Sequence, residues 1–307
     1  MDNICHTLVG AALAQTGLKR RTGLGTATLM IGANFPDIDV LSIPFGRATE
    51  FRRGWTHGLL ALVVLPFVLT GIMIAWDRYG RGSRPVERAP VVPRELLLLS
   101  AVSIMTHPTL DWMNSYGMRW LMPFDGKWFY GDSLFIVDPW LLLVLGLGVW
   151  LSRRRERASR QDAWRPARVA LGVGGAYVVS MLGLQHIAEG VVRSDLAGSG
   201  WLSHTLMVSA SPANPVRWTV YADDGARYWR GAVSLAPSVT RRLIFDEVPI
   251  EKHTGDPAAV AAARSEKGRR FLNWARLPYY QVERGAGVTR VEIVDARYGA
   301  SVDVAVD

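Results

Sequence analysis

Cysteine is almost absent from this chain, since Cys5 is the only one among 307 residues. A single cysteine excludes an intrachain disulfide, and it excludes the thiolate cage of a typical structural zinc site. The start of the sequence, Met1 to His6, also lacks the basic region and the small-residue cleavage site of a signal peptide. We therefore expect the N-terminus to be retained in the mature protein.

Charge is missing from long stretches in the first two thirds of the chain. The run from Gly58 to Trp76 contains no charged residue, and shorter apolar runs lie at 96–105, 139–151 and 169–184. About 20 apolar residues cross a bilayer, so the first run is long enough alone and the others need their flanks or neighbouring helices. The sequence predicts a mainly α fold, a polytopic membrane helix bundle with about four spans.

The remaining segments complete the predicted fold. Residues 4–18 and 23–35 are short for full spans, and we expect them to form an N-terminal helical hairpin packed within the bundle. After residue 190 the pattern changes to short strands with Pro and Gly turns, plus one helix predicted over 257–276. We predict two domains: a membrane-embedded helical domain over 1–190 and a small soluble α+β domain over 191–307.

The net charge of +8 is located mainly in two loops. Residues 77–94 carry five arginines against two acidic residues, and residues 152–168 carry seven against two. Arginine-rich loops beside membrane helices are typical of the cytoplasmic face, so we expect no nucleic-acid partner. A smaller cluster at Lys19, Arg20 and Arg21 is of the same kind. The partner expected from this distribution is the lipid bilayer, which we expect the chain to cross several times.

Histidine and aspartate residues stand near the ends of the apolar stretches. Imidazole and carboxylate groups bind zinc and similar ions, and His107 and Asp111 are four residues apart, on one face of a helix. With the basic loops on the cytoplasmic side, the predicted helices bring all these residues, and the C-terminal domain, to the extracytoplasmic side. The set consists of His6, Asp37, Asp39, His57, His107, Asp111 and Asp138.

A purely structural interpretation is open for several of these residues. His6 can be an interfacial cap, Asp37 and Asp39 can cap turns after Pro36, and Asp138 before Pro139 can be a helix N-cap. His57 and the pair His107 and Asp111 are harder to explain structurally, because ionisable groups bordering membrane helices are costly and usually functional.

Several sequence motifs follow one another over roughly residues 1–150. They are Met1-Asp2 with His6–Gly10, Asn34–Val40, Arg53–His57, His107–Trp112, Tyr116-Gly117, Pro123-Phe124 and Ile136–Pro139. In these motifs and their order the chain resembles the bacterial inner-membrane metal-dependent hydrolases, the YdjM-like, LexA-binding family. The resemblance implies a membrane-bound, zinc-dependent hydrolase located in the bacterial inner membrane.

One position departs from the family pattern. The third motif usually begins with histidine, where this chain has Arg52. A guanidinium keeps its proton and cannot bind a metal ion. Either the position is not a ligand in the family, or this chain has lost a ligand. In the second case it can also have lost a second metal ion. Arg52 and Arg53 are instead suited to hold a phosphate or carboxylate group.

We expect one or two divalent ions, zinc before others, held by His6, Asp37, Asp39, His57, His107 and Asp111. A metal-bound water would attack, Asp39 or Asp138 would act as general base, and Arg52 or Arg53 would bind the negative charge of the substrate. An ester or phosphoester of a lipid or other amphiphile at the outer membrane surface fits a site beneath interfacial aromatic residues.

Two other functions remain open from the sequence. The same side chains can line a route for a metal ion or a proton, in which case they would be stacked at several depths. The protein can also be an envelope scaffold whose C-terminal domain binds a partner and whose metal ion is structural.

Overall fold

The computed structural model describes residues 1–45, 51–80, 89–201, 205–237, 243–285 and 287–306. The chain separates into two compact units, one holding Met1–Gly46 and Phe51–Leu184 and the other holding Gln185–Asp307. The predicted domain boundary at residue 190 falls inside a long helix, α7, that runs through the division.

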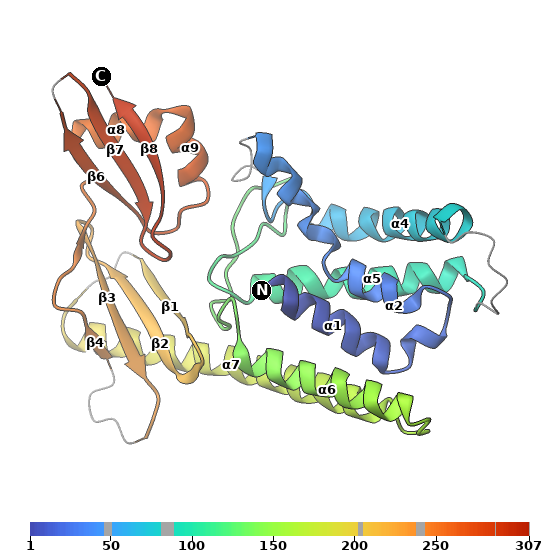
Figure 1. Ribbon diagram of the computed structural model, residues 1–307. Helices are drawn as coiled ribbons and strands as arrows, with labels where there is room; N and C mark the ends of the chain where they lie inside the picture. The colour runs from blue at the N-terminus through green and yellow to red at the C-terminus, as the bar shows by residue number, and fades with distance from the viewer. Residues whose placement is uncertain (46–50, 81–88, 202–204, 238–242, 286, 307) are drawn as a thin grey trace. The chain divides into compact units, whose positions relative to one another are not determined.

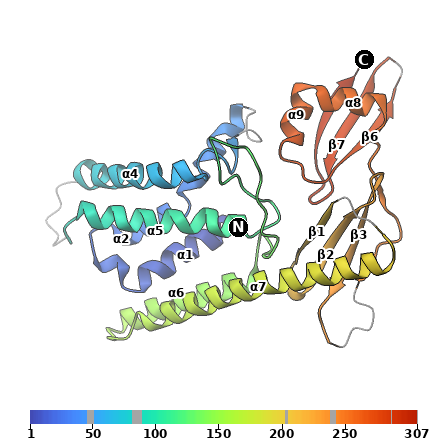
Figure 2. The ribbon, with the colours of Figure 1, turned by 180° about the vertical axis from the view of Figure 1, so that it is seen from behind.

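The first unit is a bundle of helices (Figures 1 and 2). In chain order it contains α1 (Asn3–Gln15), the short 3₁₀ helix η1 (Leu18–Arg20), α2 (Gly25–Gly32), the 3₁₀ segment η2 (Phe35–Phe45), α4 (Leu59–Ala75) extended by the π-helical turn η3 (Trp76–Gly80), α5 (Pro93–Trp112), α6 (Pro139–Arg157) and the first part of α7 (Arg165–Gly198). The predicted hairpin corresponds to α1 and α2.

Small residues bring α1, α2 and α5 close together. A Cβ atom at Gly10 of α1 would lie 2.4 Å from the carbonyl oxygen of Leu29 in α2, and one at Gly32 would lie 2.0 Å from Ser103 Oγ in α5. At Gly10 glycine is therefore required for the two backbones to approach this closely, and at Gly32 a larger residue would displace the side chain of Ser103. This packing puts the end of α2 against the C-terminal half of α5.

The prediction of four spans is not supported. Among the described residues, Leu59–Gly80 and Arg165–Gly198 are long and apolar enough to cross a membrane, by length and composition alone. The other two expected spans lie in α5 and α6, and these helices carry polar residues: α5 has Arg94 and Glu95 in its first turn and Asp111 near its end, and α6 ends in an arginine cluster. These groups lower the hydropathy of helices of only 20 and 19 residues.

The second unit has both sheets and helices. One antiparallel sheet has the order β1 (Leu206–Ser211), β2 (Asn214–Asp223), β3 (Arg227–Ser234), β4 (Leu243–Phe245), and β5 (Ile250–Glu251) also pairs with β3. A second antiparallel sheet has the order β6 (Pro278–Arg284), β7 (Thr289–Asp295), β8 (Ala300–Val306).

The single helix predicted over 257–276 is wrong. The structure has two helices there, α8 (Pro257–Arg264) and α9 (Glu266–Leu272), separated at Ser265. Ser265 is extended, with ψ 159°, and its hydroxyl accepts a hydrogen bond from Gly268 N as the N-cap of α9. The side chain of serine competes with helical hydrogen bonding, which is why it ends one helix and begins another.

Candidate metal centre

Three segments of the first unit bring four of the predicted ligands together. Asp37 comes from η2, His57 from the turn that precedes α4, and His107 and Asp111 from successive turns of α5. One ligand atom from each of these side chains lies within 4.8 Å of all the others, and three of the four residues are buried.

The separations of these atoms suit a single small cation. His107 Nε2 lies 3.5 Å from Asp37 Oδ1 and 3.4 Å from Asp111 Oδ2. His57 Nε2 lies 3.7 Å and 3.5 Å from the same two oxygens. Four ligands placed tetrahedrally about 2.0–2.2 Å from a zinc ion would be separated by about 3.3–3.6 Å.

The same four atoms lack hydrogen-bond partners. Asp37 Oδ1, His57 Nε2, His107 Nε2 and Asp111 Oδ2 are buried and make no hydrogen bond with any described residue. Burying a polar atom without a partner costs about 1–3 kcal/mol, and here four such atoms face one another. A divalent cation would satisfy all four, so these residues fit a metal ion.

The two histidines are oriented by groups behind them. His107 Nδ1 lies 2.7 Å from the carbonyl oxygen of Ala33, to which it donates a hydrogen bond, and this leaves the lone pair on Nε2. His57 Nδ1 lies 3.0 Å from Thr56 Oγ1 and 3.6 Å from Asp39 Oδ2. Such partners are typical of metal-binding histidines, whose tautomer and ring orientation they fix.

Asp39, predicted as a ligand, lies behind His57 rather than in the group of four. Its Oδ2 accepts a hydrogen bond of 2.8 Å from the backbone amide of Arg53, and its Oδ1 is buried without a partner among the described residues. Its position therefore resembles that of the carboxylate in a carboxylate–histidine–metal arrangement.

Asp111 is engaged through both oxygens. While Oδ2 faces His57 and His107, Oδ1 contacts the α-amino group of Met1, His6 Nε2 at 3.3 Å and Arg53 Nη2 at 3.2 Å. The ring of His6 stacks on that of His107, with 3.8 Å between centroids. His6, predicted as a ligand, thus lies next to the group of four but outside it, because it contacts the Asp111 oxygen that does not face His57 and His107.

Arg53, predicted to bind substrate, is buried and held by the protein. Its Nη1 donates to Asn114 Oδ1 at 3.2 Å and to the Gly117 oxygen at 3.3 Å, and its guanidinium lies 4.4 Å from the ring centre of Tyr116. Arg52 is half-buried, and its carbonyl oxygen accepts a hydrogen bond from Arg119 Nη2. Because these contacts fix the guanidinium beside Asp111 Oδ1, Arg53 holds Asp111 ionised and in place.

The structure does not bring Asp138 into the group. Its Oδ1 accepts a hydrogen bond from Leu141 N, as the N-cap of α6, and its Oδ2 accepts one of 2.8 Å from the hydroxyl of Tyr177 in α7. This is the N-cap role that the sequence left open. A carboxylate followed by Pro at the first helical position is a common helix start.

The electrostatics of His57 and Asp37 also suit a metal ion. Both residues lie outside the two helices that are apolar enough to cross a membrane. Burial lowers the pKa of His57 below its usual value, so the imidazole is neutral at pH 7, the form that ligates a metal ion. Burial acts to raise the pKa of Asp37, but the adjacent imidazole of His107 outweighs it and brings the pKa down to about 2. Asp37 is therefore an anion at neutral pH.

Several contacts had no signal in the sequence. The Ala33 carbonyl and the Met1 amino group belong to the backbone, and a backbone group has no residue type to mark it. Asn114, which binds Arg53, stands just beyond the motif His107–Trp112 and was not singled out. Thr56 lies inside a quoted motif, but its position beside His57 Nδ1 depends on the turn that the chain makes there.

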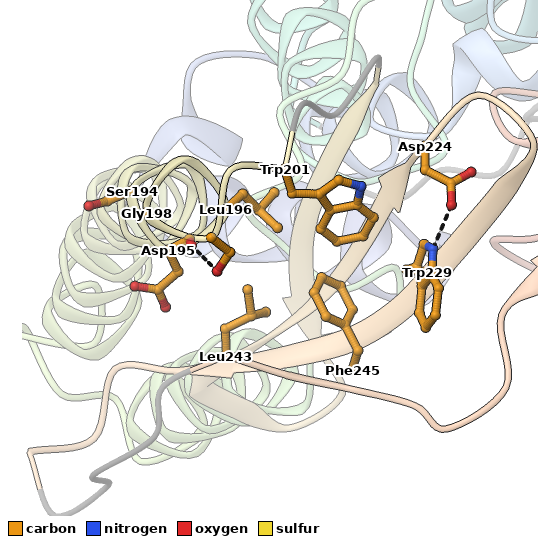
Figure 3. A pocket seen from close by; sticks show the side chains of 10 residues that line it. Ser194, Asp195, Leu196, Gly198, Trp201, Asp224, Trp229, Leu243 and Phe245 are labelled. Atoms are coloured by element: carbon orange, nitrogen blue, oxygen red, sulfur yellow. Dashed lines mark hydrogen bonds between the residues drawn. The ribbon is translucent and has the colours of Figure 1, made fainter.

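The second unit has a separate hollow of about 930 Å³. Figure 3 shows the rings of Trp201, Trp229 and Phe245 gathered on one side of it and Leu196 and Leu243 on the other. Trp229 Nε1 donates a hydrogen bond of 2.9 Å to Asp224 Oδ2. None of the residues predicted to be functional lines this hollow.

Comparison with known proteins identifies the family of the chain. No curated protein and no solved structure gives a significant match to the chain. The sequence model of one family, described as YdjM inner membrane protein, matches residues 1–188, a range that contains every predicted ligand. The expected family resemblance is confirmed, and the chain belongs to the YdjM inner membrane protein family.

Proposed function

We propose that this protein is a membrane-bound, metal-dependent hydrolase with one divalent ion, zinc before others, held by Asp37, His57, His107 and Asp111. The observation that carries the proposal is that four side-chain atoms lie within 4.8 Å of one another and that all four are buried without a hydrogen-bond partner among the described residues. Two imidazoles and two carboxylates form a donor set of the kind that zinc prefers.

The ion would supply an activated water, because zinc lowers the pKa of a bound water to near neutrality. The protein's own residues hold the ligands in place. The Ala33 oxygen orients His107, Asp39 and Thr56 orient His57, and Arg53 and the Met1 amine hold Asp111.

Neither carboxylate expected to act as general base lies where that role requires it. Both oxygens of Asp138 accept hydrogen bonds from α6 and α7. Asp39 lies 3.6 Å from His57 Nδ1, on the side of the ring away from the Nε2 that faces the other ligands, so we assign it to orienting His57.

The proposed substrate is an ester or phosphoester of a lipid or other amphiphile, hydrolysed at the extracytoplasmic face. Membership of an inner-membrane family and two helices apolar enough to cross a bilayer support the membrane setting. The basic loops at 77–94 and 152–168 support the sidedness through the positive-inside rule. Arg52, a partly buried residue, is the proposed contact for substrate charge.

The gathering of the four ligand atoms around one point supports a bound ion over a transport route. A route for protons or metal ions would place exchangeable groups in succession across the membrane. Here the candidate ligands come from three segments and meet within one coordination sphere.

The direct test is hydrolysis by the detergent-purified protein of phospholipids, lipid phosphoesters and short-chain esters, before and after chelation. Activity that is lost on chelation, restored by zinc and missing in His57→Ala supports the proposal. Activity that persists equally in His57→Ala and in chelated protein would come from a contaminant or another site and would contradict it.

A further inference from the structure

The segment η2, which supplies Asp37, combines buried acidic and exposed aliphatic side chains. A 3₁₀ helix has three residues per turn, so Ile38 and Leu41 share one side, and Asp37 and Asp39 lie on the other two. The Asp39 side chain is buried against Arg53, but Leu41 is 72% exposed, and Ile38 and Ile43 are also exposed. The segment that supplies a candidate metal ligand therefore also exposes several aliphatic side chains.

Two other segments place exposed aromatic side chains near the N-terminal end of α4, the helix that follows His57. Trp55, two residues before the ligand His57, is 50% exposed, and Phe124 is 83% exposed. The loop that carries Phe124 packs on the start of α4, where Leu59 N donates to the Trp120 oxygen at 2.9 Å. We name this set, Ile38, Leu41, Ile43, Trp55 and Phe124, the apolar rim.

The rim is continuous along the chain with a surface suited to lipid. Trp55 leads into α4, whose side chains Leu59, Val63 and Phe67 are exposed on a helix apolar enough to cross a bilayer. No charged side chain is found in η2 between Asp39 and Phe45. Leaving such large apolar side chains in water is unfavourable by about 25 cal/mol per Å², whereas aromatic and aliphatic groups at the edge of a span suit the membrane interface.

We propose that the apolar rim inserts into the bilayer surface, so that η2 is an interfacial segment that also supplies the candidate metal ligand Asp37. The occupant of the rim is the phospholipid bilayer. The consequence for function rests on the proposed hydrolase activity. It is that the substrate is a membrane lipid, which enters the site directly from the bilayer.

Membrane contact is tested by a label that does not depend on activity. The native Cys5 is buried, so a thiol-reactive environment-sensitive fluorophore can be directed to an introduced cysteine. The variants are Leu41→Cys, Phe124→Cys and, as control, Val248→Cys, an exposed aliphatic position of the second unit. The labelled proteins are reconstituted in phosphatidylglycerol–phosphatidylethanolamine vesicles.

We expect labels at 41 and 124 to emit at shorter wavelength than the label at 248 and to be quenched by nitroxide-bearing phospholipids. Emission typical of water at 41 and 124 would overturn the proposal. Shielded emission that lipid nitroxides do not quench would also overturn it, because a protein would then cover the rim.

The catalytic consequence is tested with Leu41→Asn. We expect hydrolysis of vesicle lipid to fall about tenfold, because a polar side chain replaces an aliphatic one that would insert into the bilayer. Metal content and hydrolysis of a water-soluble short-chain ester should stay unchanged. Equal loss on both substrates would contradict direct entry from the bilayer. If no substrate is hydrolysed but the labels are quenched by lipid, the proposed function fails and the membrane contact stands.

Discussion

At the residue scale, the centre depends on carboxylates with distinct tasks. Asp111 faces two histidines with one oxygen and three donors with the other, whereas Asp39 stands behind His57 and Asp138 caps α6. These three side chains have the same chemistry, and only their surroundings separate a ligand from an orienting group or a cap. Motif spacing predicted the ligands on α5, since residues four apart share a helix face. It could not assign Asp39 or Asp138, because that depends on which backbone amide lies within reach.

The distinction between Asp39 and Asp138 predicts different outcomes for two matched substitutions. Asp39→Asn should weaken metal affinity about 10- to 100-fold, the usual effect of losing an outer-shell partner. Asp138→Asn should leave affinity unchanged, because the N-cap lies outside the group of four. Competition with a fluorescent chelator measures both, and equal losses in the two variants would contradict the assignment.

Arg53 offers a second test at this scale. In Arg53→Met the buried Asp111 loses its guanidinium partner, and breaking a buried pair costs about 3–5 kcal/mol, so the thermal unfolding temperature should fall sharply. Arg53→Lys should recover only part of this loss, because an ammonium cannot reproduce the contacts to Asp111, Asn114 and Gly117. If instead Arg53 binds substrate, both variants would unfold as the natural protein does and would show only a raised KM.

At the scale of elements, close helix packing and helix caps place the site. The motifs around His6 and His107 predicted helices there, but the glycine contacts that bring α1 and α2 against α5 come from tertiary packing, which a single sequence does not display. The break at Ser265 was missed for a related reason: serine is tolerated within a helix, and only its hydrogen bond to Gly268 N makes it a cap.

Helix proximity can be tested by adding one methyl group. Gly10→Ala should destabilise the protein by about 1–3 kcal/mol, the usual effect of overpacking, because its Cβ would lie 2.4 Å from the Leu29 oxygen. Metal affinity should fall as well, since α1 carries His6 and follows directly on Met1, and both residues contact Asp111. Gly172→Ala in α7 is the control, as nothing lies within 4 Å of its Cβ. Denaturation and metal titration that did not distinguish the two variants would argue against this packing.

The cap of α8 predicts a pH dependence in the second unit. Asp256 accepts hydrogen bonds from Arg284 and from the backbone amide of Ala258, and these lower its pKa below the usual value of 3.8. A carboxyl with a lowered folded-state pKa stabilises the fold above its unfolded pKa, and the contribution is lost as pH falls through the folded value.

The stability difference between the natural protein and Asp256→Asn should therefore be constant from pH 7 to 5 and shrink below about pH 4. Thermal unfolding of the two proteins followed over this range measures it. A difference that does not change with pH would mean that the ionised carboxylate contributes nothing.

At the scale of the whole molecule, the family match and the ligands fall in the same part of the chain. The match covers residues 1–188, and the four ligand residues lie between positions 37 and 111. The sequence predicted the apolar helices from long uncharged runs. Two of the four expected spans, Leu59–Gly80 and Arg165–Gly198, are supported by length and composition, whereas the charged and polar residues of α5 and α6 lower the hydropathy of those helices. One of the charged residues of α5, Asp111, belongs to the candidate metal centre.

The central claim is that this centre holds a divalent metal ion, and elemental analysis of the detergent-purified protein tests it most directly. The comparison is between the full chain and its His107→Ala, Asp111→Ala double variant, with Asp138→Asn as a control for effects on folding. We predict about one divalent ion per chain in the natural protein and in the control, and none in the double variant. No metal in any of the three proteins, or equal metal in all of them, would contradict the account.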